Sequence, residues 1–228
     1  MTNILGIETA TKNCSVALFQ NGELKTFKEL AGAYSHAENL AAFAEDVLAE
    51  AHVKFNDLQA VAISKGPGSY TGLRIGVSFA KGLCYGLDIP LISIDTLQHM
   101  AYSAIEYVQD PDALYCSMVD ARRMEVYAAL YNNKLEEQRK IKAEVIDSDT
   151  YLSFLEKKKV FFYGDGSSKC KEIITHPNAK FLDLLLPSAK SMGKLAQQAH
   201  DNQAYVDLAY FEPFYYKEFV ALKGKPMV

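Results

Sequence analysis

The sequence has no excess of basic residues. Its 228 residues include 24 lysines and arginines against 28 aspartates and glutamates, which gives a net charge of -4, and no long basic run appears. A protein that grips nucleic acid by itself neutralises phosphates with a basic excess or a basic stripe. The composition therefore argues against direct nucleic-acid binding by this chain alone, although a local basic face formed by the fold stays open.

Long apolar runs and paired cysteine motifs are also missing. No apolar stretch reaches membrane-spanning length, and no secretory leader precedes the first expected strand at residues 3–7. The four cysteines lie far apart, at Cys14, Cys84, Cys116 and Cys170. No pair has the spacing of a metal site or of a redox motif. We expect a cytoplasmic protein without a membrane partner, whose thiols are buried and reduced.

A glycine-rich stretch at residues 65–76 is the most informative segment that is present. It follows an apolar run typical of a strand and opens an apolar helix expected over Gly72–Gly86. A helix N-terminus after such a turn suits an anion, because free backbone N–H groups point outward there. The spacing matches neither the P-loop nor the dinucleotide-binding fingerprint, and no lysine lies inside the loop. Gly66, Gly68 and Ser69 are candidate anion or nucleotide contacts, and a tight turn without a ligand is the alternative.

One order of elements occurs twice along the chain: three strands, a helix, a strand, a glycine turn and a second helix. In the first half we expect strands at 3–9, 14–20, 23–29, 60–64 and 91–94, with helices at 35–50, at 72–86 and from 95 onward. In the second half we expect strands at 114–119, 124–131, 135–145 and 160–163, with helices at about 148–155 and after the glycine turn 164–168.

The repeat favours a duplicated α/β fold of the actin-like ATPase (ribonuclease H-like) class, with two lobes that each hold a mixed sheet flanked by helices. We place the first lobe at residues 1–103 and a smaller second lobe at 104–204. A C-terminal segment at 205–228, rich in aromatic residues, is expected to return and pack on the first lobe. A generic α/β chain whose elements coincide by chance is the alternative.

An acidic residue ends the first strand of each half, where an ATPase of this fold places a carboxylate near metal-bound phosphates. Glu8 and Asp120 are therefore candidate nucleotide contacts through a magnesium ion, while capping of the following turn is the simpler explanation. Arg122 follows in the turn after Asp120. Its guanidinium suits a phosphate or a carboxylate of a partner, and a solvated hairpin tip is the alternative.

The helix expected at residues 72–86 is apolar nearly all round, so nearly all of its surface has to be covered. A row of small residues at a spacing of four runs along it: Gly72, Gly76, Ala80 and Cys84. Such a row permits close approach of another helix. One side of the helix can lie on its own sheet. The pattern allows either the helix at 35–50 or a second protein chain to pack against the other side.

Four segments together resemble the TsaB (YeaZ) family: GIETAT (6–11), KGPGSYTGLRIG (65–76), DARRMEVY (120–127) and EPFY (212–215). The resemblance extends along essentially the whole chain. It implies a bacterial accessory subunit of the machinery that makes threonylcarbamoyladenosine on tRNA, similar to the TsaD/Kae1-type catalytic subunit but without its active site. The implied partners are that catalytic subunit, a small TsaE-type ATPase subunit and a second copy of the chain, with tRNA contacted only through the complex. No cofactor is expected on this chain, whereas ATP and a divalent metal are expected on the partner subunits.

The resemblance also implies that the metal site of the catalytic type is absent. That type carries Asn-His-x-x-x-His where this chain reads DTLQHM (95–100), so Thr96 and Met100 stand at the two histidine positions. Neither side chain is a ligand for a catalytic divalent metal, and His99 is out of register. Asp95 suits the N-cap of a helix, with Gln98 as its capping-box partner.

With the resemblance, a partner interface is favoured over packing within one domain for the two apolar helices. We expect them to dock against matching helices of the catalytic partner, or of a second copy in a homodimer. The expected interface residues are Ser35, His36, Leu40, Phe43, Val47, Tyr70, Gly72, Leu73, Arg74, Gly76, Val77, Ala80, Leu83 and Cys84.

Two enzymatic alternatives compete with an accessory role. A magnesium-dependent ATPase or phosphotransferase would use both glycine loops, and it predicts that the isolated chain binds ATP with magnesium. A metalloprotease is disfavoured, because the sequence contains no His-Glu-x-x-His motif and no histidine pair.

Overall fold

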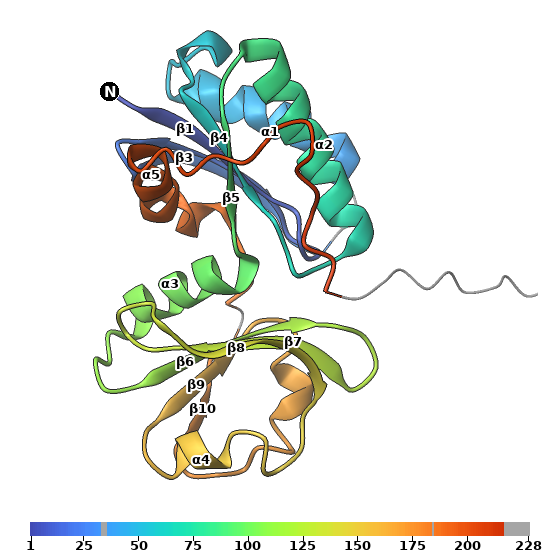
Figure 1. Ribbon diagram of the computed structural model, residues 1–228, viewed down its shortest axis with the longest axis vertical. Coiled ribbons are helices and arrows are strands. Elements are labelled where there is room, and N and C mark those ends of the chain that lie inside the picture. The colour runs from blue at the N-terminus through green and yellow to red at the C-terminus, as the bar shows by residue number, and fades with distance from the viewer. Residues whose placement is uncertain (33–35, 184, 217–228) are drawn as a thin grey trace, which may run out of the picture.

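The computed structural model describes residues 1–32, 36–183 and 185–216. The chain forms two five-stranded sheets at opposite ends of an elongated molecule, with helix α3 (Thr96–Val108) between them (Figure 1). Ser35, expected as a helix cap and an interface residue, lies outside the described residues. The last part of the expected C-terminal segment, 217–228, lies outside them too.

The first sheet has the strand order β3-β2-β1-β4-β5. Its strands are β1 (Asn3–Glu8), β2 (Cys14–Gln20), β3 (Glu23–Leu30), β4 (Ala60–Ser64) and β5 (Leu91–Ile94). The first three are antiparallel, and β4 and β5 run parallel to β1. Asn21 and Gly22, with φ of 51° and 81°, turn the chain between β2 and β3, as an Asn-Gly pair predicts.

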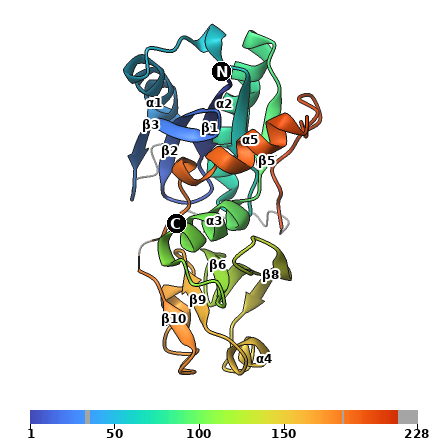
Figure 2. The same cartoon turned by 90° about the vertical axis from the view of Figure 1, so that its left-hand side faces the viewer.

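Helices cover both faces of this sheet. Helices α1 (His36–Glu50) and α2 (Tyr70–Leu87) lie on one face, and α5 (Gly193–Asp201) lies on the other (Figure 2). All six residues of β1 are buried as a result. Leu5 and Ile7 join the core under α1 and α2, while Ile4 joins the core under α5. A central strand that is covered on both faces reads as a continuous apolar run, which is the pattern seen in the sequence.

The second sheet repeats the topology of the first. Its order is β10-β9-β6-β7-β8, with β6, β7, β8, β9 and β10 in the places of β1, β2, β3, β4 and β5. The strands are β6 (Leu114–Asp120), β7 (Glu125–Tyr131), β8 (Glu137–Val145), β9 (Val160–Tyr163) and β10 (Ala179–Phe181). The duplicated actin-like ATPase fold is thereby confirmed, whereas β10 was not expected from the sequence.

The helices of the second half are shorter than expected. The helix expected at 148–155 is a single turn, α4 (Leu152–Leu155), and the glycine turn at 164–168 leads only into a 3₁₀ turn at Ser168–Cys170. Three consecutive β-branched residues (Ile173, Ile174 and Thr175) follow that turn, and Pro177 comes soon after. Both features disfavour a helix, so the chain runs into β10 instead.

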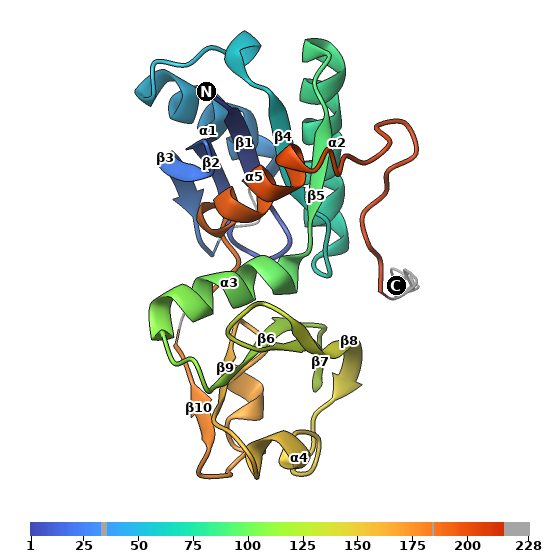
Figure 3. The same ribbon diagram turned by 60° about the vertical axis from the view of Figure 1, so that its left-hand side comes forward.

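The last helix of each half packs on the sheet of the other half, which corrects the expected lobe boundaries. Helix α3 follows β5 but packs on β6 and β7, and α5 follows β10 but packs on β1 and β5 (Figure 3). The return to the first lobe begins earlier than residue 205, because Ala189 and Met192 already pack against Phe19 of the first sheet. The second lobe therefore comprises about residues 96–187.

The C-terminal strap, residues 205–216, is a surface segment rather than a core element. Lys81 of α2 donates to the carbonyls of Ala209 and Phe211, and the Phe214 amide donates to the Lys65 carbonyl at 2.7 Å. The Tyr216 hydroxyl then donates to the Ile141 carbonyl of β8, so the strap joins the two lobes. Tyr210 is 86% exposed, whereas Phe211 packs, together with Val206 and Leu208, against the apolar core of the first lobe.

The four cysteines are buried and free, as expected. Burial raises the pKa of Cys14 and Cys84 to about 11 and that of Cys116 to about 12. At pH 8 only about one thiol in a thousand or fewer is then the reactive thiolate at these three positions. We expect the folded protein to resist iodoacetamide at pH 8, with rapid alkylation after denaturation, as mass spectrometry would show.

Among the described helices, none has the length and apolar character required to cross a membrane.

Candidate functional site

The glycine loop is held against the end of β1. Ser69 begins α2 as its N-cap, accepting from the Gly72 amide at 3.2 Å, and the Ser69 amide donates to the Ala10 carbonyl at 2.6 Å. Gly68 leaves no room for a side chain, because a Cβ there would overlap the Ala10 carbonyl. Gly66 has a φ of +110°, which favours glycine. The helix therefore starts at Tyr70, two residues before the expected start.

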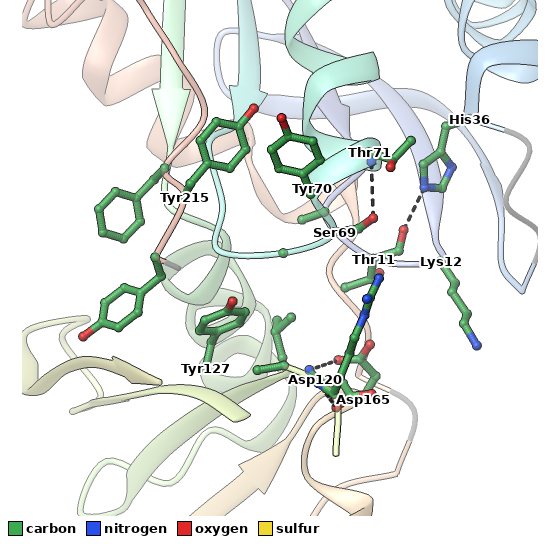
Figure 4. Close-up of a pocket in the computed structure, with 18 of the residues that line it drawn as sticks. Thr11, Lys12, His36, Ser69, Tyr70, Thr71, Asp120, Tyr127, Asp165 and Tyr215 are labelled. Atoms are coloured by element: carbon green, nitrogen blue, oxygen red, sulfur yellow. Dashed lines mark hydrogen bonds between the residues drawn. The ribbon is translucent and has the colours of Figure 1, made fainter. Parts of the chain in front are cut away.

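A cleft of about 580 Å³ lies between the lobes next to this loop (Figure 4). Segments 10–12 and 68–72 line it from the first lobe, and 119–122 with Tyr127 line it from the second. Phe214, Tyr215 and Tyr216 of the strap form a further wall. Four predicted contacts thus meet in one place: Gly68, Ser69, Asp120 and Arg122. Glu8 and Gly66, the other two, do not line the cleft.

Glu8 is instead buried in a polar cluster with His99 of α3. Its Oε2 lies 2.6 Å from His99 Nε2, its Oε1 accepts from the Ala10 amide at 2.5 Å, and both side chains have no exposed surface. His99 Nδ1 lies 2.8 Å from the Ser191 hydroxyl, which itself donates to the Ser188 carbonyl. Nδ1–H therefore donates to Ser191, and Nε2 shares a fully buried hydrogen bond with the Glu8 carboxyl. The turn-capping explanation of Glu8 is supported, and the nucleotide contact is not.

Asp120, the corresponding acid of the second lobe, is paired with Lys169. The Lys169 ammonium donates to Asp120 Oδ1 and to the carbonyls of Arg123 and Glu125. The Asp120 carboxylate also caps its own turn by accepting from the Arg122 amide at 2.9 Å. Lys169 was missed in the sequence, because it comes 49 residues after Asp120 and belongs to no motif.

Asp165 stands beside Asp120 at the floor of the cleft. Its Oδ1 accepts from the Asp120 amide at 3.0 Å. Shielding of its carboxyl from water raises the pKa of Asp165, and the hydrogen bond from the Asp120 amide partly opposes this rise.

The turn that carries Arg122 has an unusual backbone. Arg122 and Arg123 both have positive φ, at 71° and 52°, a region that side-chain-bearing residues seldom adopt. Lys169 holds this turn through the Arg123 and Glu125 carbonyls. Arg122 lines the cleft and Arg123 does not. In the part of the chain that the structure describes, the Arg122 guanidinium makes no hydrogen bond or ion pair.

The row of small residues on α2 faces the core of its own lobe, which corrects the expected interface. A Cβ on Gly72 would overlap the Thr9 carbonyl, and a Cβ on Gly76 would overlap the Thr9 hydroxyl. The expected interface residues that are buried within the lobe are His36, Leu40, Val47, Gly72, Leu73, Gly76, Val77, Ala80 and Cys84. The close approach that Gly72 and Gly76 permit is made to Thr9, just after the end of β1. Phe43, Tyr70, Leu83 and Arg74 keep exposed surface.

The outward surface of the same two helices forms a shallow apolar groove of about 340 Å³. Its lining residues are Ala37, Leu40, Ala41, Arg74, Ile75, Ser78 and Phe79. Gly82 and Gly86 lie further along α2, and a Cβ on either would meet no atom within 4 Å. Ile75 lines both this groove and the inter-lobe cleft, so the two are adjacent. We call this surface the α1–α2 groove.

Comparison with known proteins identifies one family along most of the chain. A family model described as TsaD, tRNA N6-adenosine threonylcarbamoyltransferase, matches residues 30–224. The tRNA threonylcarbamoyladenosine biosynthesis protein TsaB of Haemophilus influenzae is 30% identical, over 98% of this chain and 97% of that protein. The chain belongs to the TsaB family. TsaB of Escherichia coli is 31% identical over 98% of either chain. The solved structure of YeaZ from Pseudomonas aeruginosa has a TM-score of 0.81 at 27% identity, covering 94% of this chain and 100% of that chain.

In this TsaB chain the two positions expected to replace metal-binding histidines have structural roles. The Thr96 hydroxyl lies 2.6 Å from the Ser64 hydroxyl and accepts from the Gly66 amide at 3.1 Å, so it ties α3 to the glycine loop. Met100 is buried against Gly164. Asp95 caps α3 as expected, accepting from the Leu97 amide at 3.0 Å. The described residues contain no group of three or more histidine, cysteine or acidic side chains arranged to hold a metal ion.

Proposed function

We propose that this chain is an accessory, non-catalytic subunit for transfer of a threonylcarbamoyl group to adenosine of tRNA. The full-length similarity to TsaB proteins of threonylcarbamoyladenosine biosynthesis carries this proposal, and the TsaD family match supports a TsaD-type catalytic subunit as the partner. ATP and a divalent metal act on the partner subunits, a small TsaE-type ATPase joins the assembly, and tRNA is contacted through the complex in the cytoplasm.

The two acids at the strand ends support the non-catalytic part of the proposal. A metal–phosphate site needs carboxylates that can meet the ion or its bound water. Glu8 is enclosed with His99, and Asp120 is held by Lys169. Glu8 is therefore closed off from the cleft, and Asp120 is already paired with a cation of the chain itself, which argues against a magnesium-dependent ATPase or phosphotransferase.

The α1–α2 groove is the surface that we assign to the catalytic partner. Small exposed side chains at Ala37, Ala41 and Ser78 allow a partner helix to approach closely, and Ile75 and Phe79 offer apolar area to bury. We therefore place the docking of a partner helix on this outward face of α1 and α2, and not on the buried row of small residues. The same face pairs two copies of the chain when the partner is absent.

A matched pair of alanine substitutions tests the docking face. Ala41 and Ala42 are adjacent, exposed residues of α1, and only Ala41 lines the groove. We expect Ala41→Arg to weaken binding to the TsaD-type subunit by about tenfold or more, since a long charged side chain prevents close packing. Ala42→Arg should change binding by less than about twofold. Surface plasmon resonance measures the first interaction, and sedimentation velocity measures the homodimer.

Unchanged binding of Ala41→Arg to both partners would remove the α1–α2 groove from the interface. The assignment to threonylcarbamoyladenosine biosynthesis has a separate test. Cells depleted of the chain should lose the modified nucleoside from tRNA, and both the native chain and Ala42→Arg should restore it. If depleted cells lose the modified nucleoside and neither the native chain nor Ala42→Arg restores it, the proposed role itself is contradicted.

A further inference from the structure

The inter-lobe cleft has the size and walls of a small-molecule site. Its volume of about 580 Å³ lies within the range of about 300–1,000 Å³ typical of ligand pockets. Aromatic rings form much of its wall. The Tyr70 and Tyr215 rings lie 5.0 Å apart between centroids, and those of Tyr127 and Tyr216 lie 5.8 Å apart. Rings in such a wall suit a flat aromatic group, which stacks on them or meets their edges.

The charge of the cleft favours an anion. Lys12 and Arg122 both line it, whereas the Asp120 carboxylate is offset by Lys169. The first two residues of α2 line the same space. Two cations of the lining therefore stand against the carboxyl of Asp165 and the offset carboxylate of Asp120.

The strained turn supplies an independent sign of a binding role. Two consecutive arginines with positive φ form an unfavourable backbone conformation. Lys169 stabilises this turn by donating hydrogen bonds to its backbone carbonyls. The consequence is that Arg122 reaches the cleft with its guanidinium unpaired among the described residues. Such a donor is preorganised for a charge-assisted, bidentate contact with phosphate.

We propose that the inter-lobe cleft binds a nucleoside 5′-phosphate without a metal ion, its base against the tyrosine wall and its phosphate on Arg122, Lys12 and the α2 N-terminus. A monophosphate fits best, because its charge of about −2 matches two cations and needs no magnesium. A free nucleotide and a nucleotide within single-stranded RNA present this same chemistry. The site does not depend on the α1–α2 groove, so Ala41→Arg retains it.

Fluorescence titration with a ribose-labelled AMP, on the full chain in the presence of EDTA, tests the site. We expect saturable binding that AMP displaces, that magnesium does not strengthen, and that adenosine or ribose 5-phosphate displaces much less well. Arg122→Gly should weaken it by about tenfold or more, the effect of losing a hydrogen bond to a charged group. Arg123→Gly is the matched control, because both positions have positive φ and only Arg122 lines the cleft.

Competition with an adenylate hexanucleotide identifies the source of the ligand. Displacement by AMP at lower concentration supports a free nucleotide, and displacement by the hexanucleotide at lower concentration supports a nucleotide of RNA. Absence of saturation at millimolar AMP and hexanucleotide would overturn the proposal. So would a strict requirement for magnesium, or an equal loss in Arg122→Gly and Arg123→Gly while thermal melting shows both variants to be folded.

Discussion

Replacing His99 by leucine is expected to destabilise the protein by about 2–3 kcal/mol, because it leaves the fully buried Glu8 carboxyl without its hydrogen-bond partner. For a chain of this size that corresponds to a fall in melting temperature of roughly 10 °C. The hydrogen bonds from His99 to Glu8 and Ser191 join β1, α3 and the 3₁₀ turn at residues 189–191, which are the elements that connect the lobes. Loss of these bonds should therefore loosen the lobe connection as well as lower the free energy of unfolding.

A double-mutant cycle separates the charge from the packing. Glu8→Gln keeps an acceptor for the Ala10 amide but removes the charge, so Glu8→Gln combined with His99→Leu should be more stable than His99→Leu alone. Denaturant unfolding of the four proteins gives the coupling free energy. Additive effects, or a loss below about 1 kcal/mol for His99→Leu, would contradict a stabilising interaction between Glu8 and His99.

Most strands were predictable because they depend on local pattern. The Asn21-Gly22 turn fixes the β2–β3 hairpin, and the acidic residue at the end of each first strand reveals the repeat. The exchange of α3 and α5 between lobes was not predictable in this way. The apolar face of α3 indicates that it is covered, but nothing in residues 96–108 indicates which sheet provides the cover.

The candidate site was predicted in part, and the errors share one cause. Gly68, Ser69, Asp120 and Arg122 meet because the segments after β4 of the first sheet and after β6 of the second face each other across the cleft. Glu8 fails to join them because its partner, His99, comes 91 residues later. The position of Glu8 at a strand end marks it as a polar residue that needs a partner. Which residue becomes that partner depends on the tertiary fold, because the partner can be distant in the sequence.

The glycine row of α2 illustrates the same limit and provides the second large effect. Gly72→Ala would place a Cβ against the Thr9 carbonyl, and the Thr9–Ala10 backbone cannot retreat easily because the Ala10 carbonyl accepts from Ser69 at 2.6 Å. We expect a loss of about 2–3 kcal/mol, as for other overpacked sites. Gly82→Ala, on the open side of the same helix, should instead stabilise the protein by about 0.5–1 kcal/mol.

Whether Gly72→Ala lowers or raises the stability of the isolated protein decides whether this row packs within its own lobe or against a second chain. If the row met a second chain, the isolated protein would have free space at Gly72, and alanine would stabilise the helix there as it does at Gly82. If the row meets β1, the isolated protein is destabilised whether or not a partner is present. Denaturant unfolding of the two variants at a protein concentration too low for dimers makes the distinction, and a gain in stability for both would return the row to the interface.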